Sequence, residues 1–461
     1  MGSSIKDTIA AISTPIGKGG IGIIRISGDE AWKIAERIFL PKHPIADFQP
    51  HHLYLGNVLD PESRSIIDEV LISYMKAPHS YTKEDVVEIN SHSGHLVLSK
   101  ILELILRQGA RIAEPGEFTY RAFMNGRIDL TQAEAILDLI NAKSEKGLHL
   151  ASQHLKGEFG RSISSIKESL LNILAHIEAG IDFPEDEPEV MPREEIADVI
   201  ERKIMKEIEN LIGAYINRRI WLEGVDTVIV GAVNVGKSSL LNILSQEQKA
   251  IVTPLPGTTR DIIETTIYIN GIPLSVKDTA GFRKAKDQVE EIGLRLAKKK
   301  MAEAQLLLIV LDQSRDIDEF DIQLLSSAPK GKSVIVINKV DLPTVMDLRE
   351  ISNFLKSHPY VKISALKGTG IEELKWVISE LILRGDDEES SGFALNLRQK
   401  NLLLEAKKAL EASIETLRAD QPPEIVAMEI NEAINSISRI TGEVVEEDLY
   451  ERIFSNFCIG K

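Results

Sequence analysis

The spacing of apolar residues changes along the chain, and it predicts where strands and helices lie. In residues 1–125, short apolar runs at Gly22–Ser27, Val70–Met75 and Val86–Asn90 are typical of strands. His95–Gln108 instead repeats its apolar residues every three or four positions, as a helix with one buried face does. This mixture predicts an α/β domain over residues 1–125.

Between about Thr131 and Arg218 the pattern is helical. Apolar residues recur at three- and four-residue steps in two stripes, which the acidic, proline-containing stretch Asp182–Pro192 separates. The same spacing resumes at Leu397 and continues to about Ile440. The two stripes consist of Ile163, Ile166, Leu170, Ile173, Leu174 and Ile177, and of Ile196, Val199, Ile200, Ile204, Ile208, Leu211 and Ile212.

Strand-like and helix-like segments alternate between about Gly224 and Leu383, which is typical of a mostly parallel sheet with helices on both faces. Because helical segments lie on both sides of this block, we predict a multidomain α/β plus all-α protein. Its α/β block (residues 219–384) is inserted into one helical domain (residues 126–218 and 385–461); two unrelated helical segments are the alternative. The predicted strands are Thr227–Val230, Thr265–Ile269, Leu274–Lys277, Leu306–Leu311, Val334–Ile337 and Val361–Ser364.

The composition narrows the class of protein. A chain of 461 residues has room for about three domains. Its net charge of -16 argues against a protein that binds nucleic acid mainly by electrostatic attraction. No apolar run reaches the roughly 18 residues needed to span a bilayer, and no signal peptide is apparent, so we expect a cytoplasmic protein without a membrane segment. Cys458 is the only cysteine, which excludes a disulfide within one chain.

A phosphate-binding loop is indicated by Gly231–Ser238, which fits the pattern G-x-x-x-x-G-K-S between a predicted strand and an apolar helix. Backbone N–H groups at the start of a helix can hold phosphate oxygens. Lys237 would reach the β- and γ-phosphates and is a candidate catalytic residue, and the Ser238 hydroxyl would bind Mg²⁺. The loop residues that we assign to GTP binding are Asn234, Val235, Gly236, Lys237, Ser238 and Ser239.

Two further motifs would complete the phosphate and magnesium site. In Asp278–Gly281 the carboxylate can hold magnesium through water, and the last amide can meet the γ-phosphate. Thr258 and Thr259 offer a hydroxyl to the metal, and we assign Thr259 to Mg²⁺ beside Ser238. The residues assigned to GTP binding here are Thr253, Thr258, Thr259, Asp278, Thr279, Ala280 and Gly281.

The base would be recognised by Asn338–Asp341 and by Ser364, Ala365 and Leu366. The Asp341 carboxylate can accept hydrogen bonds from the N1–H and the exocyclic amine of guanine. Adenine lacks this donor pair, so ATP should be rejected. Asn338, Lys339 and Asp341 are therefore assigned to GTP. Five motifs in this order are the signature of the Ras-like P-loop GTPase superfamily.

One position departs from the Ras pattern. The residue after the D-x-x-G motif orients the attacking water in Ras, where it is glutamine. Here it is Phe282, which cannot orient water. Another group must do so, and Glu290 in the following polar segment is a candidate catalytic residue. Arg283 is an alternative source of positive charge.

The whole chain resembles the MnmE (TrmE) family of tRNA-modification GTPases. The most specific segments lie outside the nucleotide motifs: Thr14–Gly28 (TPIGKGGIGIIRISG), Pro115–Arg127 (PGEFTYRAFMNGR) and Phe457–Lys461 (FCIGK). The phosphate loop departs from the family's usual G-x-P-N-A-G-K-S, because Val233 and Val235 replace proline and alanine. Neither position supplies a side-chain ligand, so nucleotide binding is still expected.

The resemblance implies a function that residue spacing does not show. Such proteins act with a flavoprotein of the MnmG/GidA type and modify C5 of the wobble uridine in certain tRNAs, adding an aminomethyl or carboxymethylaminomethyl group. The N-terminal domain is expected to bind 5-formyl- or methylene-tetrahydrofolate through Arg25, Glu88, Arg127 and Lys461. We also expect Cys458 to take part in the modification.

The family also implies how hydrolysis is catalysed. Asn234, Thr253, Leu255 and Thr258 are expected to hold K⁺ beside the phosphates when two nucleotide domains meet, and Glu290 matches the catalytic glutamate. A homodimer, and a heterotetramer with the flavoprotein, follow from the resemblance alone.

Two other functions compete with this interpretation. A GTPase that assembles ribosomes would bind RNA without folate, but the chain has no KH-type G-x-x-G clamp in a basic setting and its net charge is -16. A folate enzyme regulated by GTP would need its own acid or base in residues 1–125, and none is apparent. Separate titrations with folate and GTP would distinguish the three.

Overall fold

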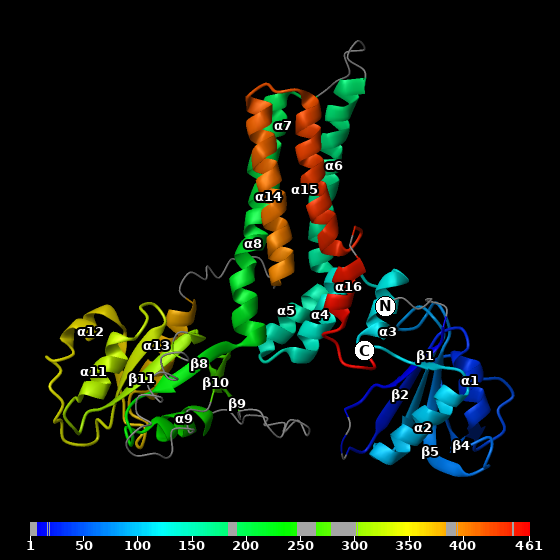
Figure 1. The fold of residues 1–461 in the computed structure, drawn as a ribbon, viewed down its shortest axis with the longest axis horizontal. Coiled ribbons are helices and arrows are strands. Elements are labelled where there is room, and N and C mark those ends of the chain that lie inside the picture. The colour runs from blue at the N-terminus through cyan, green and yellow to red at the C-terminus, as the bar shows by residue number, and fades with distance from the viewer. Residues whose placement is uncertain are drawn as a thin grey trace. The chain divides into compact units, whose positions relative to one another are not determined.

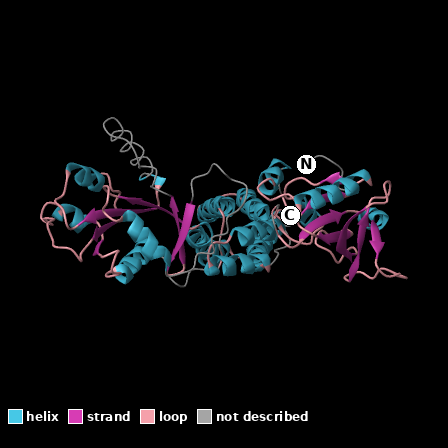
Figure 2. Cartoon of the chain, turned by 90° about the horizontal axis from the view of Figure 1, so that it is seen from below, coloured by secondary structure: helices cyan, strands magenta, loops and turns pink. Residues whose placement is uncertain are grey.

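The computed structural model describes residues 7–15, 17, 19–182, 191–246, 264–277, 301, 303–383, 393, 395–444 and 447–461 (Figure 1). The chain folds as two compact units. Residues 1–137, 153–208 and 398–461 form the first unit, and residues 138–152 and 209–397 form the second. Each unit contains one of the two sheets, whose strands are magenta in Figure 2.

The first unit begins with a seven-stranded sheet in the order β3-β4-β5-β6-β2-β1-β7. Neighbouring strands are antiparallel except for the parallel pair β1 and β7. The three strands predicted from the sequence are β2, β5 and β6; β5 begins four residues earlier than expected. The strands are β1 (Ile9–Ile12), β2 (Gly22–Ser27), β3 (Phe39–Pro41), β4 (Leu53–Leu59), β5 (Ile66–Met75), β6 (Val86–Ser91) and β7 (Arg111–Ile112).

The two faces of this sheet have different partners. Helices α1 (Ala31–Ile38) and α2 (His95–Arg107) pack on one face, where they bury the alternating apolar residues of β2, β5 and β6. On the other face, Phe118 of α3 (Glu117–Met124) packs with Ile9 and Ala11 of β1. This second face carries Arg25, Glu88 and exposed apolar side chains of β4 and β5, because side chains alternate between faces along a strand.

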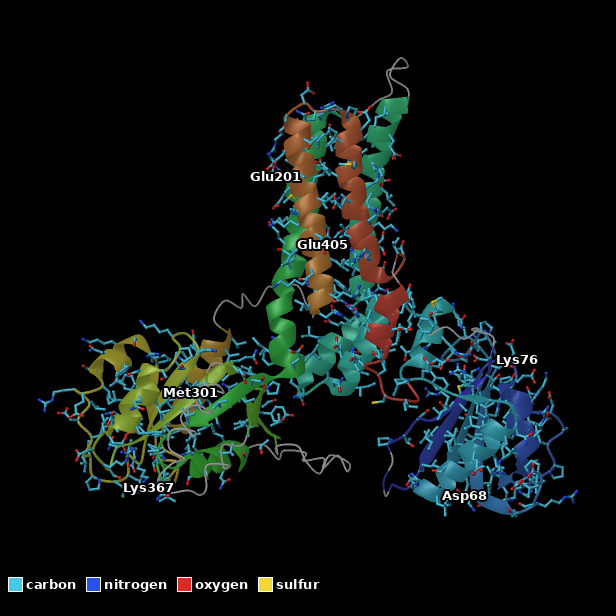
Figure 3. The ribbon with its side chains drawn as sticks, in the orientation of Figure 1. Asp68, Lys76, Glu201, Met301, Lys367 and Glu405 are labelled. Atoms are coloured by element: carbon cyan, nitrogen blue, oxygen red, sulfur yellow. The ribbon has the colours of Figure 1, made fainter. Side chains whose placement is uncertain are left out.

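The rest of the first unit is helical. Helix α6 (Glu158–Asp182) precedes the inserted block and packs along α15 (Pro423–Thr441), which follows the block (Figure 1). The first predicted apolar stripe lies on α6 and is buried throughout. Surface ion pairs join the helices before the inserted block to those after it, and one of them connects Glu201 with Arg418. Glu405 pairs with Arg439 within the second group of helices, and Glu201 and Glu405 are both labelled in Figure 3. The two helical segments therefore form one bundle, and the alternative of unrelated segments is wrong.

The helices of this part of the chain lie close to the two ranges predicted to be helical, with one addition. Helix α16 was not predicted, because its eight residues are too few to show a clear period. The helices of residues 130–223 and 397–454, of which residues 138–152 and 209–223 belong to the second unit, are α4 (Leu130–Asn141), α5 (Glu145–Leu155), α6 (Glu158–Asp182), α7 (Arg193–Val199), the π-helical turns Ile200–Met205 and Arg219–Glu223, α8 (Lys206–Arg218), α14 (Leu397–Arg418), α15 (Pro423–Thr441) and α16 (Glu447–Phe454).

The second unit contains a six-stranded sheet in the order β13-β12-β11-β8-β10-β9, in which only β9 and β10 are antiparallel. Alternate residues of β11 enter two separate cores, as expected for a sheet covered on both faces. Its elements are β8 (Val225–Val230), α9 (Lys237–Gln246), β9 (Glu264–Ile269), β10 (Ile272–Lys277), β11 (Leu306–Asp312), α11 (Glu319–Ser326), β12 (Ser333–Asn338), α12 (Ser352–Ser357), β13 (Tyr360–Lys362) and α13 (Ile371–Leu383).

Residues 138–152 lie in the range predicted for the helical domain, but they belong to the second unit, as do residues 209–218. Leu150 and Ala151 of α5 are buried in the same core as Trp221, and the Ser144 hydroxyl donates to the Trp221 carbonyl at 2.6 Å. Burial of these apolar side chains accounts for the position of the segment. Within the described parts of the chain, no helix has both the length and the apolar character of a membrane crossing.

Candidate functional site

The predicted phosphate loop connects β8 to α9. Val235 is fully buried and anchors the loop in the core of the second unit. Gly236 has a φ of +97°, and a Cβ atom there would lie 2.2 Å from Nδ2 of Asn338, so a larger residue does not fit. Lys237 donates from Nζ to the carbonyl oxygens of Gly231 (2.8 Å) and Ala232 (2.6 Å). Burial lowers the pKa of Lys237, and an anion beside the amine would oppose that effect.

Asn338 joins three of the predicted motifs. It ends β12 and is buried, and its Nδ2 donates to the Val235 carbonyl at 2.8 Å. Its Oδ1 accepts from the backbone N–H of Ala365 at 3.0 Å. Both ends of the amide are used, so its side chain links the phosphate loop to the loop expected behind the base. The structure thus brings together motifs that lie over 100 residues apart in the sequence.

The predicted base-recognition residues are also held by specific contacts. Ser364 donates from Oγ to Oδ1 of Asp341 at 2.6 Å, and Oγ of Ser364 accepts from the backbone N–H of Lys367 at 3.1 Å (Lys367 is labelled in Figure 3). The Ser364 hydroxyl lowers the pKa of Asp341, which is therefore ionised at neutral pH. Leu366 is 83% exposed and could lie against a bound ligand.

Lys339 is fixed by a buried carboxylate that the sequence did not single out. Its Nζ lies 2.5 Å from Oδ2 of Asp312 at the end of β11. Ser314 donates to the other oxygen of Asp312 through its hydroxyl (2.7 Å) and its backbone N–H (2.9 Å). Burial opposes ionisation of Asp312, but the bonds from Lys339 and Ser314 hold its pKa below the ordinary value. The carboxylate could not be found by motif, because its partner lies on another strand.

Most of the remaining predicted phosphate and metal ligands lie outside the described residues, and all of these assignments stay predictions. Of the loop residues, Ser238 and Ser239 are exposed in the first turn of α9, and Asn234 is exposed with a φ of +64°. The Ser238 hydroxyl suits Mg²⁺, which prefers oxygen ligands. The predicted site residues that lie outside the described parts of the chain are Thr253, Leu255, Thr258, Thr259, Asp278, Thr279, Ala280, Gly281, Phe282, Arg283 and Glu290.

A second group of predicted residues meets on the second face of the N-terminal sheet. Arg25 of β2 and Glu88 of β6 are directly opposite each other in the ladder. Nε and Nη2 of Arg25 lie 2.9 and 2.8 Å from Oε1 of Glu88, and both side chains are mostly buried. Nη1 of Arg25 donates to the carbonyl of Gly460 at 3.3 Å. The arginine therefore contacts the end of the chain across 435 positions of sequence.

The C-terminal segment is seated against α3 and β1. Phe454 and Phe457 pack in one apolar cluster with residues of α3 and α4. Beyond them, the N–H of Phe118 donates to the carbonyl of Lys461 at 3.2 Å. Gly460 has a φ of +93°, and a Cβ atom there would lie 2.7 Å from the Ile12 carbonyl. The arrangement brings Gly460, the residue before Lys461, into contact with Arg25, and it leaves the Cys458 side chain exposed.

Arg127 reaches this region through a residue that the sequence analysis missed. Its Nη1 donates to the Tyr81 carbonyl at 3.2 Å, and its Cζ lies 4.9 Å from the centroid of the Tyr81 ring. Cζ of Arg25 lies 5.3 Å from the same centroid. Tyr81 occupies the loop between β5 and β6, where no period or motif marks it.

An ion network supports α3 beside this group. Arg121 is 2% exposed and contacts Asp7 (2.6 Å), Glu117 (3.0 Å) and Glu84 (3.3 Å). Burial would raise the pKa of Glu117, but hydrogen bonds, first from Arg111, hold it below its ordinary value. The network ties α3 to the strand that precedes it and to the loop that contains Tyr81.

A surface cavity of about 440 Å³, lined by residues such as Trp32, Phe48 and Tyr74, includes none of the predicted site residues.

Comparison with known proteins identifies the family of the chain. The family model of the GTP-binding protein TrmE N-terminus matches residues 8–127, and that of the MnmE helical domain matches residues 130–458. The G domain of the T. maritima FeoB iron transporter matches 34% of this chain and 98% of its own, with 26% identity and a TM-score of 0.26, which does not by itself establish a shared fold.

Curated relatives match over the full length. The tRNA modification GTPase MnmE of Acetivibrio thermocellus is 46% identical over 457 residues, which is 99% of both chains. The tRNA modification GTPase MnmE of Thermoanaerobacter pseudethanolicus is 44% identical over 460 residues, which is 99% of this chain and 100% of the relative. The chain therefore belongs to the MnmE (TrmE) family of tRNA modification GTPases.

Proposed function

We propose that this GTPase acts with a flavoprotein of the MnmG/GidA type to modify C5 of the wobble uridine in certain tRNAs. The added group would be aminomethyl or carboxymethylaminomethyl, and 5-formyl- or methylene-tetrahydrofolate would supply a one-carbon unit. The observation that carries this proposal is the meeting of Arg25, Glu88 and the segment that bears Cys458 and Lys461.

The chemistry of these residues suits a folate. A pterin presents N–H donors, which a carboxylate such as that of Glu88 accepts, and the glutamate tail of a folate is anionic and suits arginine and lysine. Arg25 is already fixed by Glu88, so it would lose little further side-chain freedom on binding. The same residues hold the end of the chain, so a bound folate would lie close to Lys461.

Folate binding should depend on Arg25. We expect Arg25→Ala to weaken binding of 5-formyltetrahydrofolate by about 1.5–3 kcal/mol, because a hydrogen bond to a charged group is lost. GTP affinity should not change. Isothermal titration of the full-length protein with each ligand measures both values.

The matched control is Arg107→Ala. Arg107 is also an arginine of the first unit, but it is half-exposed on α2 and pairs with Glu103. Its replacement should leave folate binding at the wild-type value. Equal folate affinity in Arg25→Ala and wild type would remove Arg25 from the site and contradict the proposal.

The nucleotide site would work through a small number of groups. Asp341 would select guanine, and Lys237 together with the loop amides would neutralise the phosphates. Ser238 and Thr259 would hold Mg²⁺, which would supply positive charge to offset that of the phosphates. Because Phe282 cannot orient water, Glu290 would take that role directly or through a second water molecule.

Hydrolysis should depend on the monovalent cation. A K⁺ ion held by Asn234 with Thr253, Leu255 and Thr258 would stand near the charge that an arginine stabilises in other GTPases. We expect turnover in KCl to exceed that in NaCl by about 10²-fold, the effect of one charge-stabilising group at an active site. The smaller Na⁺ fits the same oxygen cage poorly.

Two variants distinguish the contribution of the bound cation from that of the residue that orients the attacking water. Asn234→Ala should erase the difference between the salts. Glu290→Ala should lower the rate in both salts while nucleotide affinity stays nearly constant, because its contribution arises in the transition state. Steady-state rates in matched KCl and NaCl measure this. Equal wild-type rates in the two salts would exclude the potassium mechanism, and a normal rate for Glu290→Ala would direct attention to Arg283.

A homodimer is part of the proposal, and the N-terminal sheet offers a surface for it. Leu53, Leu55 and Leu71 are 64%, 40% and 40% exposed on the face that carries Arg25 and Glu88. Adjacent exposed apolar side chains of this kind favour association. A second copy of the chain would cover them next to the folate site. The flavoprotein would then join two such chains in a heterotetramer that binds tRNA.

A further inference from the structure

We infer that Tyr81 is a positioning residue that holds the guanidinium groups of Arg25 and Arg127 in the proposed folate site. The inference rests on the proposed folate function and adds a residue to it. The two arginines come from distant segments, one on β2 and one after α3, and Tyr81 belongs to a third. Its ring is the group that both of them contact.

The distances fit cation–π contacts. Cζ of Arg25 and Cζ of Arg127 lie 5.3 and 4.9 Å from the ring centroid, and such contacts act within about 6 Å. The electron-rich face of an aromatic ring attracts a cation without neutralising it. Two like charges can therefore be held near one ring while each can still bind an anion.

The ring itself is held in place. The Tyr81 hydroxyl hydrogen-bonds with Oγ1 of Thr119 on α3 at 2.9 Å. The ring also packs against the cluster that contains Phe454 and Phe457 and against the one that contains Phe118. Because contacts on several sides fix the Tyr81 ring, the ring does not move with an arginine side chain and can therefore hold that side chain in position.

The two guanidinium groups differ in what else holds them. Arg25 is paired with Glu88 at 2.8 Å. Arg127 is exposed, and among the described residues it has no ion pair; its contacts are to the ring and the carbonyl of Tyr81. Without the ring, the Arg127 side chain would be held, within the described part of the chain, only by the hydrogen bond to the backbone carbonyl of residue 81, and its orientation would be less well fixed. Tyr81 should therefore act mainly through Arg127, on the affinity for an anionic ligand.

The test is titration of the full-length protein with 5-formyltetrahydrofolate. We expect Tyr81→Leu to bind about 5- to 30-fold more weakly, from the loss of two cation–π contacts. Tyr81→Phe keeps the ring and should stay within about threefold of wild type. Thr119→Val removes the same hydrogen bond from its other end and should behave like Tyr81→Phe. Equal losses in the Phe and Leu variants would overturn the inference, as would an unchanged Leu variant.

A double-mutant cycle with Arg127→Gln identifies the route of the effect. If Tyr81 acts through Arg127, its replacement costs little more once Arg127 is gone, and additive losses would overturn that route. The labelling rate of Cys458, the only thiol, reports whether the C-terminal segment has stayed in place. An unchanged rate in Tyr81→Leu supports a role in positioning the arginines, and a large increase would overturn it. A wild-type protein that binds no folate would instead contradict the proposed function.

Discussion

Replacing Asp341 with asparagine should convert this enzyme from a GTPase into an XTPase. We expect Asp341→Asn to lower GTP affinity by roughly 10²–10⁴-fold, in line with the rejection of a ligand that leaves buried polar groups unpaired. XTP affinity should rise in parallel. Fluorescence titration with GTP, XTP and ATP, followed by turnover with each nucleotide, measures the change.

The structure gives a reason to expect a clean exchange of specificity. Ser364 donates to Oδ1 of Asp341 while it accepts from the Lys367 N–H, so the direction of the hydrogen bond to Asp341 is set. An asparagine can keep Oδ1 at the same hydroxyl and present Nδ2 in place of the second carboxylate oxygen. An amide donor suits the C2 carbonyl of xanthine, whereas it cannot accept from the N1–H and the amine of guanine.

Ser364→Ala is the matched control for this exchange. It removes the hydroxyl that orients Asp341 but keeps the carboxylate, so GTP should bind more weakly and still be preferred over XTP. If Asp341→Asn still prefers GTP, then the assignment of Asn338–Asp341 to the base is wrong.

Replacing Cys458 with serine should abolish tRNA modification and leave GTP hydrolysis intact. The thiol is exposed on the segment whose next residues contact Arg25 and Phe118. A serine hydroxyl has nearly the same size, but at neutral pH it is a far weaker nucleophile than a thiol, so the change tests chemistry rather than packing. Nucleoside analysis of tRNA from cells that carry only the variant measures the outcome.

A nearby serine provides the control. Ser455 is exposed in the same segment, and its hydroxyl donates to the Arg452 carbonyl. Ser455→Ala should keep both GTP hydrolysis and the modified uridine. Normal levels of modified uridine with Cys458→Ser would show that the thiol has no part in the reaction.

Much of the fold follows from local pattern. Alternating and helical spacings predicted β2, β5, β6 and the strands of the second unit, because a side chain's burial depends on the period of its own element. The phosphate loop was recognisable for a similar reason, since its glycines, its backbone amides and the Lys237 side chain all belong to one short segment. Several short elements were missed because a few residues cannot display a clear period; they are β1, β3, β7, α1, α3 and α16, and the longer strand β4 was missed as well.

Other features depend on contacts between distant segments, which no local pattern encodes. The pairing of Lys339 with Asp312 depends on two neighbouring strands, β11 and β12, that are in register. The inclusion of residues 138–152 in the second unit depends on burial of Leu150 against Trp221. The contact of Arg25 with Gly460 requires that the helical bundle return the chain to the first sheet, where packing of Phe454 and Phe457 stabilises the final segment. Tyr81 acquires its role in the same way, because the two arginines reach its ring only after the β2–β6 ladder and α3 have packed together.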